Sequence, residues 1–433
     1  MFRLDCFIFI PDEYNHFTLK MLILYNIGIR IYYLLILFFS NFNKKAALWI
    51  KGRQKNRPIA INHSIWFHFA SLGEFEQGRP VLEQMRIAHP QSKIVVTFFS
   101  PSGYEIRKNT PLADAVYYLP LDTKKNARAF LSVINPTLAI FTKYEYWYHF
   151  FNELHQRQVP LYIISGIFRP NQVFFKWYGG LHRRMLGFVT RFFVQDEQSK
   201  QLLQTVNITN VTISGDTRFD RVWANAQNPK PLPEIAEFIN NRKTFIAGST
   251  WPADEELIAK LVTQYPDRKF IIAPHEISEE KINTLINILP PNSATRYSQF
   301  TIPNSPLTTH NSQLTAQVLI IDNIGMLSSL YQYGDITFIG GGFGAGIHNT
   351  LEAAAFGLPV IFGPNYVKFK EAKDLIALGG GFSIDDEASL KNVVSKLVDD
   401  TPFCLAAGEK AQTYVQEHVG ATDTIMSELR LVG

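Results

Sequence analysis

The stretch that determines the predicted fold is DITFIGGGFGAGIHNTLEAAAFGLPVIFGP, from Asp335 to Pro364. An apolar run leads into two glycine-rich segments, and the pattern from Asn349 to Phe356 is typical of a helix. Asn349 is a candidate N-cap, and Glu352 lies three residues later, where a capping box has its acid. Glycines admit a ligand to the backbone and a helix N-terminus attracts anions, so the stretch favours phosphate binding. An ordinary strand–turn–helix connection gives the same pattern.

Short apolar runs and helical patterns alternate in both directions from this stretch, which predicts two doubly wound, Rossmann-like α/β domains. The segment from Asn225 to Pro233 is rich in Asn and Pro and is expected to link domains at 58–225 and 226–433. The last helix, about Pro402 to His418, is expected to pack back across the first domain. Strands are expected at 65–70, 93–99, 115–118, 138–142, 161–165, 191–194, 211–213, 244–247, 269–273, 318–321, 336–339 and 359–362.

Composition limits the functional classes. A chain of 433 residues is long enough for two or three domains with large cores. The net charge of +4, from 42 Lys+Arg and 38 Asp+Glu, gives no reason to expect a nucleic acid partner. The two cysteines, Cys6 and Cys404, offer neither a disulfide framework nor a metal-binding spacing, which is typical of a reducing compartment.

The N-terminal region is predicted to attach to a membrane. Residues 21–42 read MLILYNIGIRIYYLLILFFSNF, mostly aliphatic and aromatic, with Asn26 and Arg30 as interruptions. The uninterrupted part, Ile31 to Phe39, is shorter than the roughly 20 apolar residues that a membrane span needs. No small-residue cleavage site follows, so the region does not resemble a secretory signal. Met21 is a second candidate for the first residue of the natural chain.

The charge around this region supports the same prediction. Between Glu13 and Glu74 there is no acidic residue, whereas eight basic residues occur there, six of them from Lys44 to Arg57. Such a flank binds anionic lipid on the cytoplasmic side. Residues 1–57 are therefore expected to form an anchor that enters the cytoplasmic leaflet or crosses it obliquely. The alternative is a buried helix of the first domain.

Several loops are expected at the carboxyl ends of strands, where open α/β sheets bind their ligands. Two such domains would face a central cleft. Glu74 ends the turn Ser71-Leu72-Gly73-Glu74, which follows a strand and opens a helix. A carboxylate in this position is either a helix-start acid stabilised by the helix dipole or a general base facing the cleft. The corresponding loops of the second domain are 248–250, 273–276 and 324–326.

Six motifs, taken together and in order, resemble those of one family, the Kdo (3-deoxy-D-manno-octulosonic acid) transferases of lipopolysaccharide biosynthesis. The resemblance extends over nearly the whole chain from about Met21. The motifs are AxxGE at 70–74, YEYW at 144–147, GDTRFD at 215–220, GST at 248–250, AP-H at 273–275, and HNxLE at 348–352 followed by AAxFGLPVxFGP.

The resemblance implies a GT-B glycosyltransferase that transfers Kdo from CMP-Kdo to a lipid A precursor (lipid IVA) at the cytoplasmic side of the cell inner membrane. It implies that Glu74 is the catalytic base. Arg218, Ser249 and Glu145 are further candidate site residues, the first two as phosphate partners. The residues implied to hold CMP are Pro274, His275, Ile324, Gly325, Met326, Asn349, Thr350, Leu351 and Glu352.

The sequence also departs from the family pattern in places: His275 replaces an arginine, and Lys143 stands where an acid often precedes the YEYW-like stretch. No cofactor is expected. The chain contains no Asp-x-Asp motif, so a metal-bound nucleoside-diphosphate sugar is not favoured. A single phosphate can be held by helix termini and one or two cations without a metal ion.

Two other functional classes remain open from the sequence. One is a different GT-B enzyme that uses a nucleoside-diphosphate sugar, and competition between CMP and UDP would separate it from the first. The other is a two-lobed binding protein without catalytic activity, a class that usually carries an export signal and lacks a basic cytoplasmic anchor.

Overall fold

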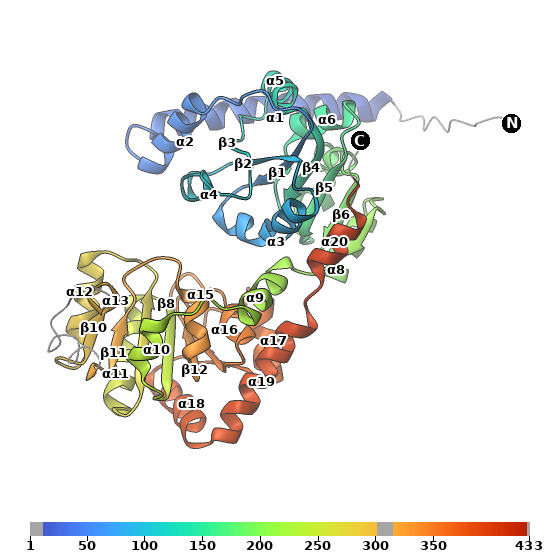
Figure 1. Ribbon diagram of the computed structural model, residues 1–433. Coiled ribbons are helices and arrows are strands. Elements are labelled where there is room, and N and C mark those ends of the chain that lie inside the picture. The colour runs from blue at the N-terminus through green and yellow to red at the C-terminus, as the bar shows by residue number, and fades with distance from the viewer. Residues whose placement is uncertain (1–11, 301–314, 431–433) are drawn as a thin grey trace. The chain divides into compact units, whose positions relative to one another are not determined.

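The computed structural model describes residues 12–300 and 315–430, with side chains from Lys20 onward. Cys6 and the alternative start Met1 lie outside the described residues. Contacts divide the chain into two compact units (Figure 1). The first comprises residues up to Arg218 together with the segment from Gly420, and the second runs from Phe219 to Val419.

The first unit contains a parallel sheet. Within the described residues this sheet has seven strands, in the order β3-β2-β1-β4-β5-β6-β7. The strands are β1 (Ser64–Phe69), β2 (Lys93–Phe98), β3 (Ala115–Tyr118), β4 (Pro136–Thr142), β5 (Leu161–Gly166), β6 (Arg191–Val194) and β7 (Val211–Ile213). The helices are α1 (Asp12–Phe39), α2 (Lys44–Lys55), α3 (Leu72–Ala88), α4 (Pro101–Arg107), α5 (Lys124–Ile134), α6 (Tyr148–Gln156), α7 (Gly180–Leu186), α8 (Glu197–Gln204) and α20 (Ala421–Glu428), with a 3₁₀ turn at Val173–Phe175.

Both faces of this sheet are buried, as expected of a parallel sheet covered by crossover helices. Every residue of β1 is buried, and alternate residues enter different cores. Phe67 and Phe69 pack with Phe75 of α3, whereas Trp66 packs on the other face with Phe130 and residues of α6. The carboxyl ends of β1 and β4 lie side by side because these two strands pair in parallel.

Helix α1 is held against the first unit along one stripe. The hydroxyl of Tyr25 donates to Asp122 Oδ2 at 2.5 Å, and Asn26 Oδ1 bonds to His149 Nε2 at 2.6 Å. Asn26, which interrupts the apolar sequence, therefore has a partner within the domain. Tyr32 packs edge-on against the ring of Trp49 of α2.

The other side of α1 is apolar and exposed. Its exposed large aliphatic and phenylalanine side chains are Ile23, Leu24, Ile27, Ile31, Leu34, Leu35, Leu37, Phe38 and Phe39. The part from Lys20 to Phe39 is long and apolar enough to cross a membrane by length and composition alone. The alternative of a buried helix is wrong, because the packed stripe leaves this apolar face uncovered in the described unit. Asn26 and Arg30 interrupt the apolar sequence but not the helix, since α1 is continuous over 28 residues.

The second unit has a parallel sheet of its own, in the order β10-β11-β9-β8-β12-β13-β14 among the described residues. The strands are β8 (Thr244–Thr250), β9 (Lys269–Pro274), β10 (Ala294–Arg296), β11 (Val318–Ile320), β12 (Ile336–Ile339), β13 (Val360–Phe362) and β14 (Gly381–Ser383). The helices are α10 (Pro233–Ile239), α11 (Pro252–Gln264), α12 (Glu279–Ile288), α13 (Tyr297–Phe300), α15 (Leu327–Leu330), α16 (Leu351–Ala355), α17 (Lys370–Leu378), α18 (Glu387–Asp399) and α19 (Thr401–Glu417), with a 3₁₀ turn at Tyr331–Tyr333.

The contacts place the division between the units at Arg218–Phe219, earlier than the predicted 225–226. The expected linker instead belongs to the second unit: α9 (Thr217–Gln227) crosses the division, and the backbone N–H of Leu232 donates to the Tyr333 hydroxyl. The helix that returns to the first unit is also not the predicted one. Helix α19 packs on α16 and α17, whereas α20 packs on α3 and buries Ile425 there.

Candidate active site

Glu74 lies in the first turn of α3, directly beyond the carboxyl end of β1. Ser71 is the N-cap, but its side chain makes no capping hydrogen bond. Instead, the Glu74 carboxylate turns back and accepts a hydrogen bond from the backbone N–H of Ala70. The side chain is partly buried. The sequence predicted this strand–turn–helix position, and the structure confirms it.

The electrostatics of Glu74 differ from those of a simple helix-start acid. A backbone N–H bond and a helix N-terminus both lower the pKa of a carboxyl group. Here burial and then the negative charge of Glu145 raise the pKa of Glu74 to about 7, against the opposing effects of the Ala70 N–H and Lys143. A carboxyl group with a pKa near 7 can take a proton and release it at neutral pH, which suits a general base.

Glu145 follows the carboxyl end of β4 and is anchored by two donors. Its Oε2 atom lies 3.2 Å from His68 Nε2 and accepts from Trp147 Nε1 at 2.9 Å. Lys143, two residues before Glu145, has a φ of +59°, a left-handed conformation that is uncommon for a residue with a side chain. Sequence reasoning missed His68, which lies inside an apolar strand. The signal available was a histidine in the otherwise apolar run IWFHF.

Arg218, a predicted phosphate partner, is bound by a carboxylate of its own unit. Asp216 accepts from Arg218 Nε at 2.8 Å and from the side-chain amide of Gln77 at 2.9 Å. The guanidinium group therefore lowers the pKa of Asp216 against the effect of burial. This network ties the GDTRFD motif to helix α3, which gives Arg218 a structural role within the first unit.

The glycines that directly follow β12 in the second unit are required by the packing of the protein itself. A side chain at Gly340 would meet the backbone of Ser249 and Thr250 at 2.3 and 2.6 Å, so β12 can approach the end of β8 only with glycine there. Gly341 has a φ of +92° and donates its N–H to Asp254 Oδ2 at 2.9 Å. At these two glycines, neighbouring protein atoms occupy the space that a side chain would need, so packing within the unit already accounts for glycine there.

The helix after the glycines is shorter than predicted. Helix α16 has five residues, and its N-cap is Thr350 rather than Asn349. Asn349 instead accepts from the backbone N–H of Leu351 at 3.2 Å and donates its side-chain amide to Glu352 Oε1 at 3.1 Å. The expected capping box does not form, because the Asn349 side chain takes the place of the N-cap backbone as the partner of Glu352.

The charge that acts on Glu352 is positive, whereas the like charge of Glu145 acts on Glu74. Burial raises the pKa of Glu352, while the positive charge of Arg221 and the Asn349 hydrogen bond oppose the increase. These two partners favour the carboxylate form. A carboxylate that keeps its charge is an acceptor for hydroxyl groups, for example those of a ribose.

Three rings meet where β8, β9 and β12 end. Trp251 Nε1 donates to His348 Nε2 at 3.1 Å. The His275 ring stacks on both, at 4.8 Å from Trp251 and 4.4 Å from His348. Burial and then His275 lower the pKa of His348 to about 4, so its neutral ring carries its hydrogen on Nδ1. Sequence reasoning missed Trp251 and His348 as site residues, although each directly follows a strand end or glycine loop.

The remaining predicted residues lie along the same edge of the second sheet. Pro274 ends β9, and the N–H of His275 donates to the carbonyl of Thr250. Ser249 has a φ of +54° at an irregularity in the pairing of β8 with β9. The loop 324–326 precedes α15, with Ile324 93% exposed and Gly325 at a φ of +96°. Thr350 and Leu351 are buried at the start of α16.

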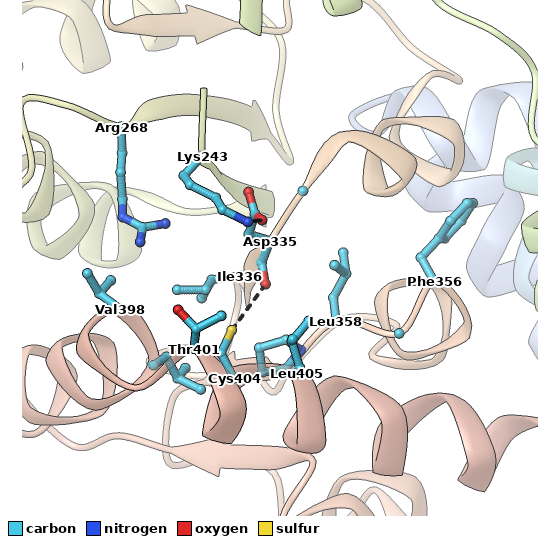
Figure 2. A pocket seen from close by; sticks show the side chains of 14 residues that line it. Lys243, Arg268, Asp335, Ile336, Phe356, Leu358, Val398, Thr401, Cys404 and Leu405 are labelled. Carbon is cyan, nitrogen blue, oxygen red and sulfur yellow. Dashed lines mark hydrogen bonds and ion pairs between the residues drawn. The ribbon is translucent and has the colours of Figure 1, made fainter. Parts of the chain in front are cut away.

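A cavity of about 250 Å³ in the second unit lies away from this edge (Figure 2). Lys243, Arg268 and Asp335 line it, and they precede β8, β9 and β12 respectively. The cavity is therefore at the amino ends of the strands. Thr401 and Cys404 of α19 complete its wall, and the Cys404 thiol contacts the Asp335 carbonyl oxygen. None of the predicted site residues lines it.

Comparison with solved structures defines the class of protein. The chain matches a UDP-N-acetylglucosamine 2-epimerase from Neisseria meningitidis with a TM-score of 0.57 at 15% identity, over 84% of this chain and 98% of that one. It matches a putative UDP-N-acetylglucosamine 2-epimerase from Listeria monocytogenes with a TM-score of 0.56 at 12% identity, over 84% and 95%. At such identities the match establishes the fold alone. Two parallel α/β units of this kind are the GT-B architecture.

Sequence comparison then gives the family. Residues 41–221 match the family model described as 3-deoxy-D-manno-octulosonic-acid transferase (kdotransferase). A 3-deoxy-D-manno-octulosonic acid transferase of Rickettsia bellii is 28% identical over 81% of each chain. That of Haemophilus influenzae is 26% identical over 88% of this chain and 89% of its own. Over most of its length the chain is similar to the Kdo transferases, a family of glycosyltransferases, which confirms the resemblance seen in the sequence.

Proposed function

We propose that this protein transfers Kdo from CMP-Kdo to the hydroxyl group of a lipid A precursor at the cytoplasmic side of the inner membrane. The observation that carries the proposal is the state of Glu74. It is a partly buried carboxylate at the end of β1 whose pKa is raised to about 7 by burial and by Glu145. In the proposed reaction Glu74 takes the proton of the acceptor hydroxyl. The oxygen of that hydroxyl bonds to the anomeric carbon of Kdo, and the bond from this carbon to the phosphate of CMP breaks, so that CMP leaves.

The second unit supports nucleotide binding. The rings of Trp251, His275 and His348 form a flat aromatic surface at the edge of the sheet. Glu352 offers a charged acceptor for ribose hydroxyls, and the neighbouring Asn349 orients it. The exposed loop 324–326 contributes backbone groups beside them. We assign CMP to this edge of the second unit.

Helix α1 supports membrane attachment. Its packed stripe includes hydrogen bonds from Tyr25 and Asn26 to the first unit, while Leu24, Leu34 and Phe38 expose apolar surface. A helix held along one side of a domain inserts most readily parallel to the membrane, with its exposed face among the lipid chains. The basic flank of the helix would attract anionic headgroups. We therefore favour monotopic insertion over a membrane span.

The test is a product assay with the full chain. The protein is incubated in detergent micelles with CMP-Kdo and a tetra-acylated lipid A precursor, and the lipids are analysed by mass spectrometry. The proposed function requires a mass increase corresponding to Kdo and stoichiometric release of CMP. Competition by CMP but not by UDP is expected. A product formed from a UDP-sugar, with no product from CMP-Kdo, would instead support the alternative class of GT-B enzyme.

A further inference from the structure

His68 is a fully buried polar side chain whose environment is set by specific partners. It lies in β1 with 0% of its surface exposed. Nδ1 lies 2.8 Å from Thr97 Oγ1, and Nε2 lies 3.2 Å from Glu145 Oε2. Burying an imidazole is unfavourable unless both nitrogens are satisfied, as they are here. The ring also packs on Phe141 at 4.8 Å.

The hydrogen bonds around His68 have one consistent direction. Trp66 Nε1 can only donate, and it donates to Thr97 Oγ1 at 2.8 Å. The Thr97 hydroxyl is closer to His68 Nδ1, at 2.8 Å, than to the Phe67 carbonyl oxygen, at 3.4 Å. With Nδ1 accepting, the neutral ring carries its hydrogen on Nε2 and donates it to Glu145. The chain of donors thus ends on the Glu145 carboxylate.

Glu145 is consequently held from two sides. His68 Nε2 and Trp147 Nε1 both donate to the same oxygen, Oε2, and the carboxylate is 13% exposed. Trp147 is itself fixed by stacking on Phe99, with ring centres 4.9 Å apart. Two such donors stabilise the ionised form of a carboxyl group.

The negative charge of Glu145 acts on Glu74. Burial and Glu145 raise the pKa of Glu74, and the Ala70 N–H and the charge of Lys143 lower it. The phenol of Tyr144 is also within electrostatic range of Glu74. On the side of α1, the phenols of Tyr25 and Tyr32 are within range of Glu145. Of the groups acting on Glu74, Glu145 alone both carries a like charge and is bonded to His68.

We propose that His68 is a positioning residue for the transfer reaction: its Nε2–H bond fixes the Glu145 carboxylate beside Glu74 and thereby sets the pH range in which Glu74 accepts a proton. The proposal rests on the proposed role of Glu74 as the base. His68 touches neither substrate nor the reacting atoms in this account.

The experiment is the pH dependence of kcat/KM for Kdo transfer by the full chain, for wild type, His68→Asn, Glu145→Gln and the double variant. Asn can bond to Thr97 but is too short to reach Glu145. Without a fixed like charge, the pKa of Glu74 falls, so the acidic limb of the profile should move to lower pH by about 0.5–1 unit in His68→Asn. Glu145→Gln should shift it in the same direction, and the double variant should shift it no further than Glu145→Gln alone.

Two further variants keep the test decisive. His68→Gln, whose amide nitrogen can reach the position of Nε2, should restore the limb toward wild type. His149→Asn removes another histidine hydrogen bond of the first unit, the one to Asn26, and should leave the limb in place. If His68→Asn folds poorly, the comparison of His68→Gln with Glu145→Gln carries the test.

Three outcomes would overturn the proposal. The first is an unmoved limb in His68→Asn accompanied only by a lower melting temperature, which is the result of a purely structural role. The second is a shift in the double variant equal to the sum of the single shifts. The third is wild-type turnover in Glu74→Gln, which would reject Glu74 as the base and the positioning role with it. Loss of turnover in Glu74→Gln together with an unmoved limb in His68→Asn rejects the positioning role alone.

Discussion

Each unit of the chain has a candidate site carboxylate in the first turn of a helix at the carboxyl edge of its sheet, Glu74 in the first and Glu352 in the second. Burial raises the pKa of both carboxyl groups. Their neighbours differ in sign. Glu74 is close to the like charge of Glu145, whereas Glu352 is close to Arg221 and the amide of Asn349.

This difference separates two kinds of chemistry on one architecture. A like charge increases the proton affinity of a carboxylate, which a base needs. An opposite charge and a donated hydrogen bond favour the ionised form of a carboxyl group, which is the stronger acceptor for hydroxyl groups. The position in the fold is shared, so the side chains of the adjacent loops, Lys143 to Trp147 in one unit and Asn349 in the other, decide the role.

The largest effect is expected from removing the proton acceptor of the first unit. Glu74→Gln keeps the shape of the side chain and should lower kcat for Kdo transfer by about 10²–10⁴-fold, the usual contribution of a general base. The affinity for CMP should not change, because the proposed nucleotide site lies in the second unit. Steady-state kinetics and calorimetric titration of CMP measure the two quantities, and near-normal turnover would remove Glu74 from the role of base.

The stability of the same variant is the control. The folded pKa of about 7 exceeds the ordinary value of 4.5 for a glutamate, so an ionised Glu74 is unfavourable in the folded state. The free energy of unfolding of wild type should therefore fall as pH rises from about 4.5 to about 7. Glu74→Gln lacks this penalty, so it should be at least as stable as wild type at pH 8. A variant that is both inactive and less stable at pH 8 would indicate a structural role instead.

Much of this comparison could be predicted from the sequence, and the parts that could not have physical reasons. Most strand positions, the class of fold and the place of Glu74 follow from local apolar runs and from the turn chemistry around them. The edge strands β10 and β14, each only three residues long, were not predicted. The start of α16 was misplaced by one to two residues, because the Asn349 side chain bonds Glu352 and Leu351 instead of acting as the N-cap. Local capping patterns do not reveal which of two competing bonds forms.

Long-range contacts account for the other differences. Gly340 resembled part of a ligand-binding loop, but its space is taken by the end of β8, a strand about ninety residues earlier in the sequence. His68 had no visible partner in sequence, since Glu145 lies 77 positions away. The rings of Trp251, His275 and His348 likewise meet only after three strands pair. Hydrophobic periodicity and motif spacing describe a single segment of the chain, whereas these contacts depend on the order of the strands in the sheet.

The next effect is expected at the second carboxylate. Glu352→Ala loses charge-assisted hydrogen bonds to the ribose worth roughly 1.5–3 kcal/mol. The dissociation constant of CMP should therefore rise about tenfold to hundredfold. Calorimetric titration measures it, with a thermal melting curve of each protein alongside.

The matched control is Asp386→Ala in the same unit. Asp386 is the N-cap of α18 and accepts from the N–H of Ser389 at 2.8 Å, so its loss should cost about 1 kcal/mol of stability and leave CMP affinity unchanged. If Glu352→Ala behaves like this control, with a lower melting temperature and normal affinity, Glu352 is a structural residue and the two carboxylates are not the functional pair proposed here.

The smallest effect concerns a third buried carboxylate, Asp122, which sharpens the comparison because its partners are all donors. It accepts from the backbone N–H groups of His149 and Phe150, each at 3.1 Å, and from the Tyr25 hydroxyl of α1. Burial outweighs these bonds and raises its pKa to about 6. Tyr25→Phe removes one donor from a buried carboxylate and should lower the free energy of unfolding by about 1–2 kcal/mol at pH 8. The loss should shrink below about pH 6, where Asp122 is protonated and needs that donor less.

Leu34→Asn combined with Phe38→Asn changes only exposed side chains of α1, so it should keep this stability and weaken cosedimentation with anionic lipid vesicles. Urea unfolding and vesicle cosedimentation therefore separate the two sides of the helix. Equal loss of stability in both variants would show that the exposed face of α1 is also packed in the folded protein, and would argue against membrane insertion through it.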